Sequence, residues 1–219
     1  LDRVKFLGRR MILATDMKQH DRIMSEIREK IVNGDDLLED DASVALLLGL
    51  ILKCADISNQ ARPRHIAAKW NDRVYQEFYR EGDQDRKRGR QVLNLHDRHK
   101  NDTNSSSVGF IGFVVVPLYK LLGKAILEVE NKHQFGLRTR IVDECLVGLD
   151  ANKERYAKIV NGEKVDEAPV HVVEDVETPP GINGEHQQRS AKFFNYRAGH
   201  ATPQEGVEAH FRAREGSYR

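Results

Sequence analysis

Apolar residues recur at helical spacing from residue 2 to residue 160, and this periodicity is the feature that most limits the fold. Val4, Leu7 and Met11, for example, fall at positions i, i+3 and i+7 of one helix face. No segment in this range shows apolar and polar residues alternating between hairpin turns, as a half-buried strand requires. We therefore predict that the first 160 residues are all-α, with a break near Thr15.

The best apolar run, Val44–Leu52, is rich in Leu and predicts a buried helix. It is far shorter than the roughly 20 residues that a spanning helix needs, so we expect no membrane span. A helix over residues 108–130 should kink at Pro117, because proline removes a backbone hydrogen bond and clashes with the preceding turn. A last helix is expected over residues 137–160, with Ile141 on its apolar side.

Residues 163–219 differ in composition from residues 1–162. Residues 163–177 hold six acidic residues and one Lys, whereas residues 187–219 hold six basic residues and three acidic ones. Large aliphatic side chains are sparse, so this segment cannot bury enough apolar area to offset its ordering entropy. We predict a helical domain over 1–162 and a low-order, acidic-then-basic tail over 163–219.

The overall charge and the cysteine content exclude some classes of protein. Lys plus Arg number 35 and Asp plus Glu number 34, a net charge of +1, which argues against bulk attraction to nucleic acid. Cys54 and Cys145 are the two cysteines, too few for a disulfide scaffold or a zinc site built from three or four cysteines. Two thiols suit a reducing compartment, and no signal peptide precedes the first helix, so we expect a cytoplasmic protein.

Three groups of residues have both a functional and a structural interpretation. Asp56 follows a buried apolar helix, where a carboxylate is costly unless it binds metal, enters catalysis, or caps a turn. A stripe at i+4 spacing, from Ile66 through Trp70 to Phe78, suits either the core or a cofactor pocket. The polar segment 96–107 suits a metal cluster or, more simply, a flexible loop.

Several segments, in order, resemble the class I cyclic nucleotide phosphodiesterases. Met11–His20, MILATDMKQH, is similar to the family's ILATDMxxH segment, and Cys54–Pro63, CADISNQARP, is similar to its ADxSNxxxP segment. The second motif continues through Trp70 to EFYREGDQDRKRG, which resembles EFFxQGDxExxxG. Residues 108–118, VGFIGFVVVPL, resemble VGFIxFxxxPL, and Asn152–Tyr156 resembles the NxxxW/Y ending.

The resemblance covers about residues 1–162 and implies the C-terminal part of a multi-helix, HD-domain-like catalytic fold. The family hydrolyses the 3′,5′-cyclic phosphodiester of cAMP or cGMP to the 5′-monophosphate in signal transduction. It uses Zn²⁺ and a second divalent ion, usually Mg²⁺. A hydroxide shared by the two cations attacks phosphorus, and a histidine acid protonates the departing ribose oxygen.

Carried over position by position, the resemblance makes Asp56 a zinc ligand. It makes Phe110 the aromatic residue that stacks on the purine. The positions that match the nucleotide pocket are Met17, Asn59, Asn71, Val74, Phe78, Ser107 and Phe110. The resemblance thus implies a cyclic nucleotide as the ligand.

The first departure from the family is the absence of its metal-binding front half. Two zinc-binding histidines, a bridging aspartate and the acid histidine precede ILATDM in the family, in HNxxHxxD and HD motifs that this sequence lacks. A catalytic zinc needs about three protein ligands, and Asp56 is the one credible ligand here. We therefore expect no catalytic residue in this chain and no hydrolysis by it alone. Because the chain starts at Leu1 inside a helix, the expected partner is the N-terminal half of the catalytic domain. A second copy of the chain, forming a homodimer, is the other partner considered.

The second departure is Ser107, which stands where the family places its purine-reading glutamine. A serine cannot make the paired hydrogen bonds to the purine edge, and their loss should cost about 1–3 kcal/mol. This predicts weak or altered base selection, which Ser107→Gln should correct.

A rival interpretation is a catalytically inactive regulatory or binding protein that kept the helical scaffold. The missing front half and Ser107 support it. The retained pocket and metal-ligand positions oppose it: Asp56, Asn59, Phe78 and Phe110.

Overall fold

The computed structural model of the protein describes residues 1–165, and all regular structure in that range is helical. The all-α prediction is confirmed for these residues. The predicted tail lies outside them from residue 166 onward, so the division of the chain at residue 162 stays a prediction. The α-helices are α1 (Asp2–Ala14), α2 (His20–Asn33), α3 (Asp41–Asp56), α4 (Arg64–Lys87), α5 (Thr103–Phe110), α6 (Val116–His133) and α7 (Arg140–Val160).

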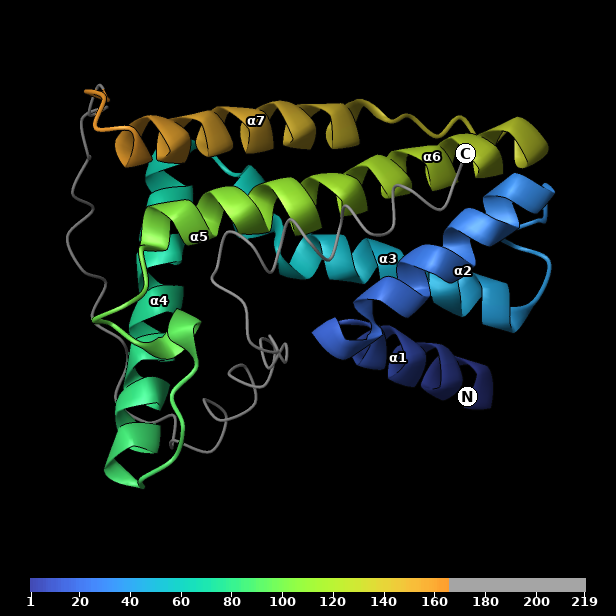
Figure 1. Cartoon of the computed structure of the whole chain (residues 1–219). Helices are drawn as coiled ribbons and strands as arrows, with labels where there is room; N and C mark the ends of the chain where they lie inside the picture. Colours follow the sequence, from blue (N-terminus) through green and yellow to red (C-terminus); the bar gives the residue numbers. More distant parts are fainter. Residues whose placement is uncertain (166–219) are drawn as a thin grey trace, which may run out of the picture.

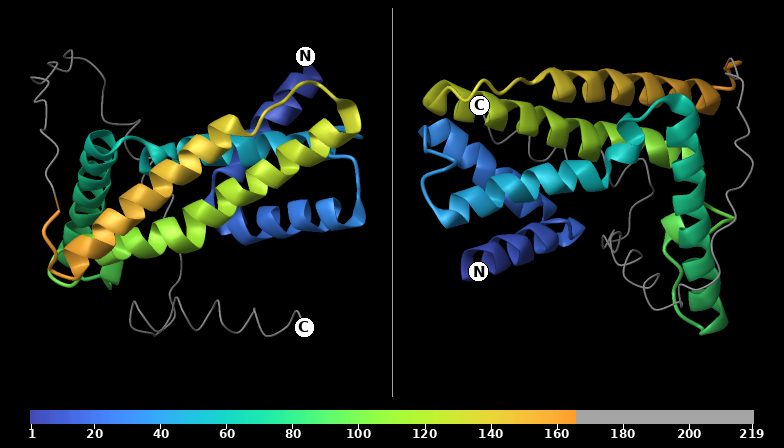
Figure 2. Two further views of the ribbon diagram at one scale, coloured as in Figure 1. Left: turned by 90° about the horizontal axis from the view of Figure 1, so that it is seen from above. Right: turned by 180° about the vertical axis from the view of Figure 1, so that it is seen from behind.

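Most of these helices run roughly along one direction, and α4 crosses them steeply at one end (Figure 1). Helices α5 and α6 form one long rod, and α7 returns along it after a turn. Helix α3 lies on the other side of the rod, and α1 packs against α3 (Figure 2). The short 3-10 helix η2 (Ser58–Ala61) connects α3 to α4 and contacts α7.

The main core lies where α2, α3, α6 and α7 meet. The fully buried apolar side chains at its centre come from different helices: Ile27, Leu50, Leu118 and Leu149. Each of these four helices turns apolar residues toward this centre, whereas on α1 Ala14 is the one buried residue and Val4 of its expected apolar face is 71% exposed. The expected break near Thr15 is also present, because α1 ends at Ala14 and the side chain of Asp16 then caps the short η1 (Met17–Gln19).

The long rod contains a π-helical turn, η4 (Ile111–Val115), directly before Pro117. A wider turn accommodates the proline, which cannot donate the usual backbone hydrogen bond. The structure thus has a local π turn next to Pro117, and the predicted kink of the helix stays a prediction. Residues Ile111 and Val115 of this turn are fully buried in the core.

Two expected apolar faces are wrong by one residue. On α4, Trp70 is 49% exposed with the guanidinium of Arg73 over its ring, and the buried face runs through Ala67 and Asn71 instead. On α7, Ile141 is 69% exposed, and the neighbouring Val142 is buried. In both helices, the prediction assumed that a large apolar residue faces the core. In the structure the helix is rotated about its axis, so that a neighbouring residue faces the core instead.

The helix Thr103–His133 is long and apolar enough, by length and composition, to cross a membrane. Its inward residues belong to the core described above, and a core helix of a folded domain passes the same test. The apolar run Val44–Leu52, on which the prediction of no membrane span rests, is shorter than this helix. The expected absence of a membrane span therefore stays a prediction.

Candidate functional site

Four buried polar residues converge where α4 meets α5, and we call them the Asn71 cluster: Gln60, Asn71, Tyr75 and Ser107. The Oδ1 atom of Asn71 accepts hydrogen bonds from Gln60 Nε2 at 3.2 Å and from Ser107 Oγ at 3.1 Å. The Ser107 hydroxyl also lies 2.6 Å from the carbonyl oxygen of Thr103 and 3.4 Å from the Tyr75 hydroxyl. Two expected nucleotide-binding residues, Asn71 and Ser107, are therefore in direct contact.

Helix α4 presents Asn71 and Tyr75 at i and i+4, so that both point toward α5. Helix α5 begins at Thr103, because Asp102 accepts hydrogen bonds from the backbone of Asn104 and Ser105. The expected start of this helix at residue 108 is therefore wrong. The earlier start places Ser107 inside the helix, one turn beyond Thr103, and turns it toward α4.

Gln60 is held in place by α7. The Nδ2 atom of Asn152 donates to the carbonyl oxygens of Gln60 at 2.8 Å and of Arg62 at 2.9 Å. Gly148 permits this approach, since a Cβ atom on it would lie 2.3 Å from the carbonyl oxygen of Ala61. The NxxxW/Y motif thus has a structural role, because its Asn152 fixes the 3-10 turn that carries Gln60.

An aromatic group continues from the Asn71 cluster along α4. Phe78 packs edge-on against Tyr75, with ring centroids 6.0 Å apart, and stacks on His96 at 4.9 Å. Val74 packs against the same group. Burial raises the pKa of Tyr75 to about 12, so its hydroxyl stays protonated and remains a donor at neutral pH. The structure therefore places Val74 and Phe78 next to Asn71.

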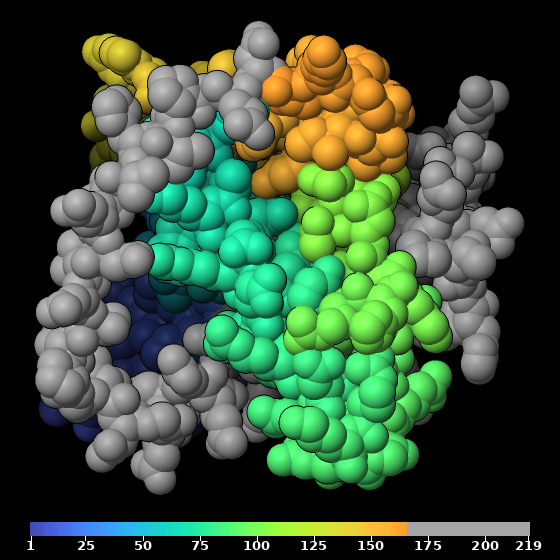
Figure 3. All heavy atoms as spheres, turned by 90° about the vertical axis from the view of Figure 1, so that its left-hand side faces the viewer, coloured from blue at the N-terminus to red at the C-terminus, as the bar shows by residue number. Residues whose placement is uncertain are grey.

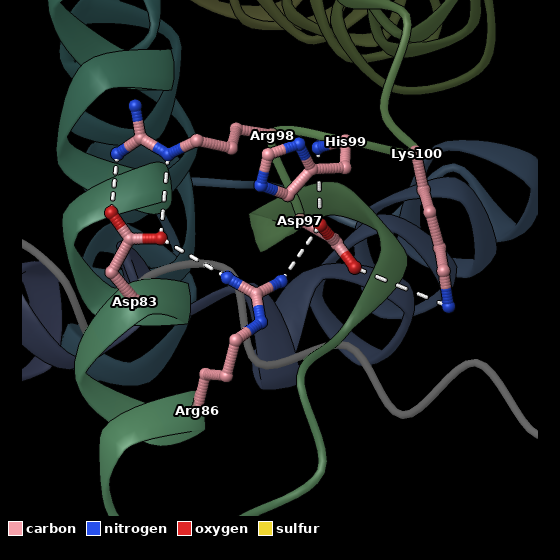
Figure 4. A network of polar contacts seen from close by, with 6 residues as sticks. All are labelled: Asp83, Arg86, Asp97, Arg98, His99 and Lys100. Carbon is pink, nitrogen blue, oxygen red and sulfur yellow. Dashed lines mark hydrogen bonds and ion pairs between the residues drawn. The ribbon is translucent and has the colours of Figure 1, made fainter.

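Ion pairs fasten the segment between α4 and α5 to α4 itself (Figure 4). Arg86 bridges Asp83 at 3.2 Å and Asp97 at 2.9 Å, and Arg98 pairs with Asp83 at 2.5 Å. The backbone N–H of His99 and the guanidinium of Arg86 lower the pKa of the Asp97 carboxyl. Both His96 and Asp97 are buried in this connecting segment, and among residues 1–165 no group of three or more His, Cys, Asp or Glu residues is arranged there to hold a metal ion.

A second group of expected site residues surrounds Lys53, which is only 1% exposed. Its ammonium lies 3.6 Å from Met17 Sδ and near the carbonyl oxygens of Ala14 and Asp16, at 3.3 and 3.5 Å. Desolvation raises the pKa of nearby Asp56, and the positive charge of Lys53 opposes this rise. Met17, the first residue of η1, and Asp56, the last residue of α3, thus both lie near Lys53.

The remaining two expected residues are half-buried. Asn59 precedes Gln60 in η2, and Phe110 follows Ser107 by one turn of α5 and packs against the core. Figure 3 faces the outer side of α4 and shows it beside the start of α5, with the end of α7 above both. The polar and aromatic residues of α4 and α5 therefore gather at one end of the molecule.

Among residues 1–165, no group of three or more His, Cys, Asp or Glu residues is arranged to hold a metal ion. Asp56 keeps an exposed surface at the end of α3, so it is not a fully buried carboxylate, although desolvation by its neighbours still raises its pKa. The described residues thus supply one candidate ligand and do not form the family's two-metal site by themselves.

Comparison with known proteins identifies the family. Residues 2–134 match the profile of the 3'5'-cyclic nucleotide phosphodiesterase family. The chain belongs to this family. The fold agrees, since the solved structure of LmjPDEB1 in complex with IBMX is similar with a TM-score of 0.58 and 26% sequence identity, over 70% of this chain and 42% of that one.

The phosphodiesterase sequence is also similar to proteins named high affinity cGMP-specific 3',5'-cyclic phosphodiesterase 9A. It is 35% identical to the mouse protein over 121 residues, which are 55% of this chain and 22% of that protein. The chain is also 35% identical to the human protein, over 20% of that protein's length. It is 38% identical to the Drosophila protein, over 8% of that protein's length. The match thus spans at most 22% of these three relatives.

Sequence reasoning missed Gln60 and Tyr75, and it considered His96 as part of a metal cluster and not as a partner of Phe78. Gln60 lies inside the ADISNQARP motif, and Tyr75 follows Asn71 by four residues, so that the inward face of α4 would have indicated it. Nothing in the local sequence indicates that His96 stacks on Phe78, because that contact depends on how the following segment folds back along α4.

Proposed function

We propose that this chain forms the nucleotide-binding part of a phosphodiesterase that hydrolyses a 3′,5′-cyclic nucleotide to its 5′-monophosphate. The observation that carries the proposal is the convergence of expected pocket residues on facing surfaces of α4 and α5 in a chain of this family. Asn71 contacts Ser107 directly, and Phe78 lies one aromatic contact away. The relatives' stated specificity favours cGMP as the first ligand to test.

Each site residue has a physical role in this proposal. The aromatic ring of Phe110 stacks on the purine, and Val74 and Phe78 supply apolar surface around it. Met17 and Asn59 complete the pocket from the side of α3. Asp56 serves as one ligand of the family's Zn²⁺ and Mg²⁺ site, in a domain whose other ligands lie outside the described residues. The proposed location of the protein is the cytoplasm.

The test is ligand binding by the purified chain. Calorimetric titration with cGMP and with cAMP should give saturable binding, and Phe110→Ala should weaken it because the purine loses its stacking partner. Leu127→Ala, an exposed residue of the same rod, is the matched control and should bind like the wild type. Absence of binding to either nucleotide would contradict the proposal.

The second candidate function is that of a catalytically inactive regulatory or binding protein. The observation that favours it is the lack of a three-ligand metal group among residues 1–165. An assay with Zn²⁺, Mg²⁺ and cGMP distinguishes the two in the natural full-length protein. Hydrolysis that is lost in Asp56→Asn supports the enzyme, whereas cyclic nucleotide binding without hydrolysis supports the regulator.

A further inference from the structure

Gln60 carries a buried polar atom that has no hydrogen-bond partner. Its side chain is only 4% exposed, and its Oε1 atom contacts no donor in the part of the chain that the structure describes. A buried acceptor without a donor costs about 1–3 kcal/mol. Such an atom calls for a partner that residues 1–165 do not supply.

The orientation of this amide follows from its neighbours. Asn71 Oδ1 accepts from Gln60 Nε2 at 3.2 Å, and it shares the single Ser107 hydroxyl proton with the carbonyl oxygen of Thr103. Asn71 Oδ1 therefore faces the amide nitrogen of Gln60 and leaves Oε1 pointing elsewhere. Asn152 fixes the Gln60 backbone from the other side through its carbonyl oxygen. Gln60 is thus held at its backbone carbonyl and at its side-chain nitrogen, and its Oε1 atom is the acceptor that remains without a donor.

The nitrogen of the Asn71 side chain is the complementary group. With Oδ1 occupied, Nδ2 remains a donor for which no acceptor is found among residues 1–165. Gln60 Oε1 and Asn71 Nδ2 together offer one acceptor and one donor from two hydrogen-bonded amides. A single glutamine side chain offers this same pair of groups.

We infer that Gln60 and Asn71 together read the purine edge of the cyclic nucleotide, in place of the glutamine that Ser107 replaces. This inference rests on the proposed function. Guanine presents an N1–H donor beside its O6 acceptor, and adenine presents an N6–H donor beside its N1 acceptor. Either edge supplies the donor that Gln60 Oε1 lacks and the acceptor that Asn71 Nδ2 lacks.

Ser107 has a positioning role in this arrangement. Its hydroxyl is too short to reach a base, and it is 1% exposed, but it holds Asn71 Oδ1 at 3.1 Å. Asn71, which is 9% exposed, is the most accessible member of the cluster. The base edge therefore reaches Asn71 first. The Gln60 side chain then moves so that its Oε1 atom meets the donor of the base.

The test compares three ligands with the full chain and with Gln60→Met, which keeps the length of the side chain but removes the amide. The ligands are cGMP, cAMP and the 3′,5′-cyclic phosphate of unsubstituted purine riboside, whose base has no donor for Gln60. Gln60→Met should bind cGMP and cAMP about tenfold more weakly, and the unsubstituted purine with unchanged affinity. Gln76→Met, at an exposed position of α4, is the matched control and should bind all three like the wild type.

An NMR measurement keeps the inference testable if Gln60→Met folds poorly. In the ¹⁵N-labelled wild type, the side-chain amide signals of Gln60 and Asn71 should both shift with cGMP, and only the Asn71 signal should shift with the unsubstituted purine. Equal loss of affinity for all three ligands, or no loss, would overturn the inference while leaving the proposed function intact. A wild-type chain that binds none of the three ligands contradicts the proposed function, and the inference with it.

Discussion

The carbonyl oxygen of His96 lies against Gly82 of α4, so close that a Cβ atom on this glycine would stand 2.0 Å from it. Real Cβ atoms do not approach a backbone oxygen at that distance. The glycine of the EFYREGD motif is thus a packing requirement, because it lets the segment after α4 fold back along the helix. His96 can then stack on Phe78 at 4.9 Å.

Gly82→Ala should therefore destabilise the fold. The clash forces the 94–96 segment away from α4 at a cost of about 1–3 kcal/mol, which outweighs the roughly 1 kcal/mol that alanine gains over glycine in a helix. Urea unfolding of both proteins measures the difference. Gly8→Ala is the matched control in α1, where nothing lies within 4 Å of the added Cβ atom, and it should stabilise slightly. If both variants are stabilised alike, the proposed close contact is wrong.

Asn152→Ala should lower the free energy of unfolding by about 2–3 kcal/mol. Its Nδ2 atom serves the carbonyl oxygens of Gln60 and Arg62, and the substitution leaves both without this donor near the buried core. Chemical denaturation checks the magnitude. Asn161→Ala, at an exposed position just after α7, should change stability by less than about 0.5 kcal/mol. Equal effects of the two substitutions would show that the Asn152 contacts contribute no stability.

The helices could be predicted from sequence because their apolar periods are long and regular. The break near Thr15 and the end of α2 at Gly34, with a positive φ of 72°, follow from local residue types. Which face of α4 turns toward the core could not be predicted in the same way. Its inward face contains Ala67 and Asn71, whereas the larger Trp70 remains near the surface under Arg73.

The candidate site shows the same division. Motif resemblance indicated Asn71 and Ser107 separately, but the hydrogen bond between them joins residues 36 positions apart and depends on how α5 packs on α4. Gln60 was not predicted at all, since its role depends on Asn152 in α7. Residue types at motif positions can be read locally, whereas the partners that orient them come from the tertiary fold.

The stability of the fold should fall as the pH decreases from about 6.5 to about 4. Burial, and then the positive charge of Lys53, lower the pKa of His20 from 6.5 to about 4. The unfolded chain therefore binds a proton in this window that the folded chain does not, and the free energy of unfolding rises with pH there. Protonation of His20 alone should lower the free energy of unfolding by about 1–3 kcal/mol across this pH range.

Urea midpoints at pH 7.0, 5.5 and 4.5 test this pH dependence. His20→Gln should be less sensitive to pH than the wild type over this range, because the residue that titrates is gone. His65→Gln removes an exposed histidine of α4 and should leave the wild-type pH dependence unchanged. Parallel curves for wild type and His20→Gln would exclude His20 as the source.

Lys53→Met should raise the pKa of His20 without restoring it to 6.5. Burial is the larger cause of the lowered pKa and remains in the variant, whereas the second cause, the cation of Lys53, is removed. Methionine keeps a similar length and apolar stem, so the buried position beside Met17 stays filled. An NMR titration of the His20 ring protons measures the pKa directly. Lys69→Met, at an exposed position of α4, should leave it unchanged, and a His20 pKa that also stays unchanged in Lys53→Met would show that the two charges do not interact.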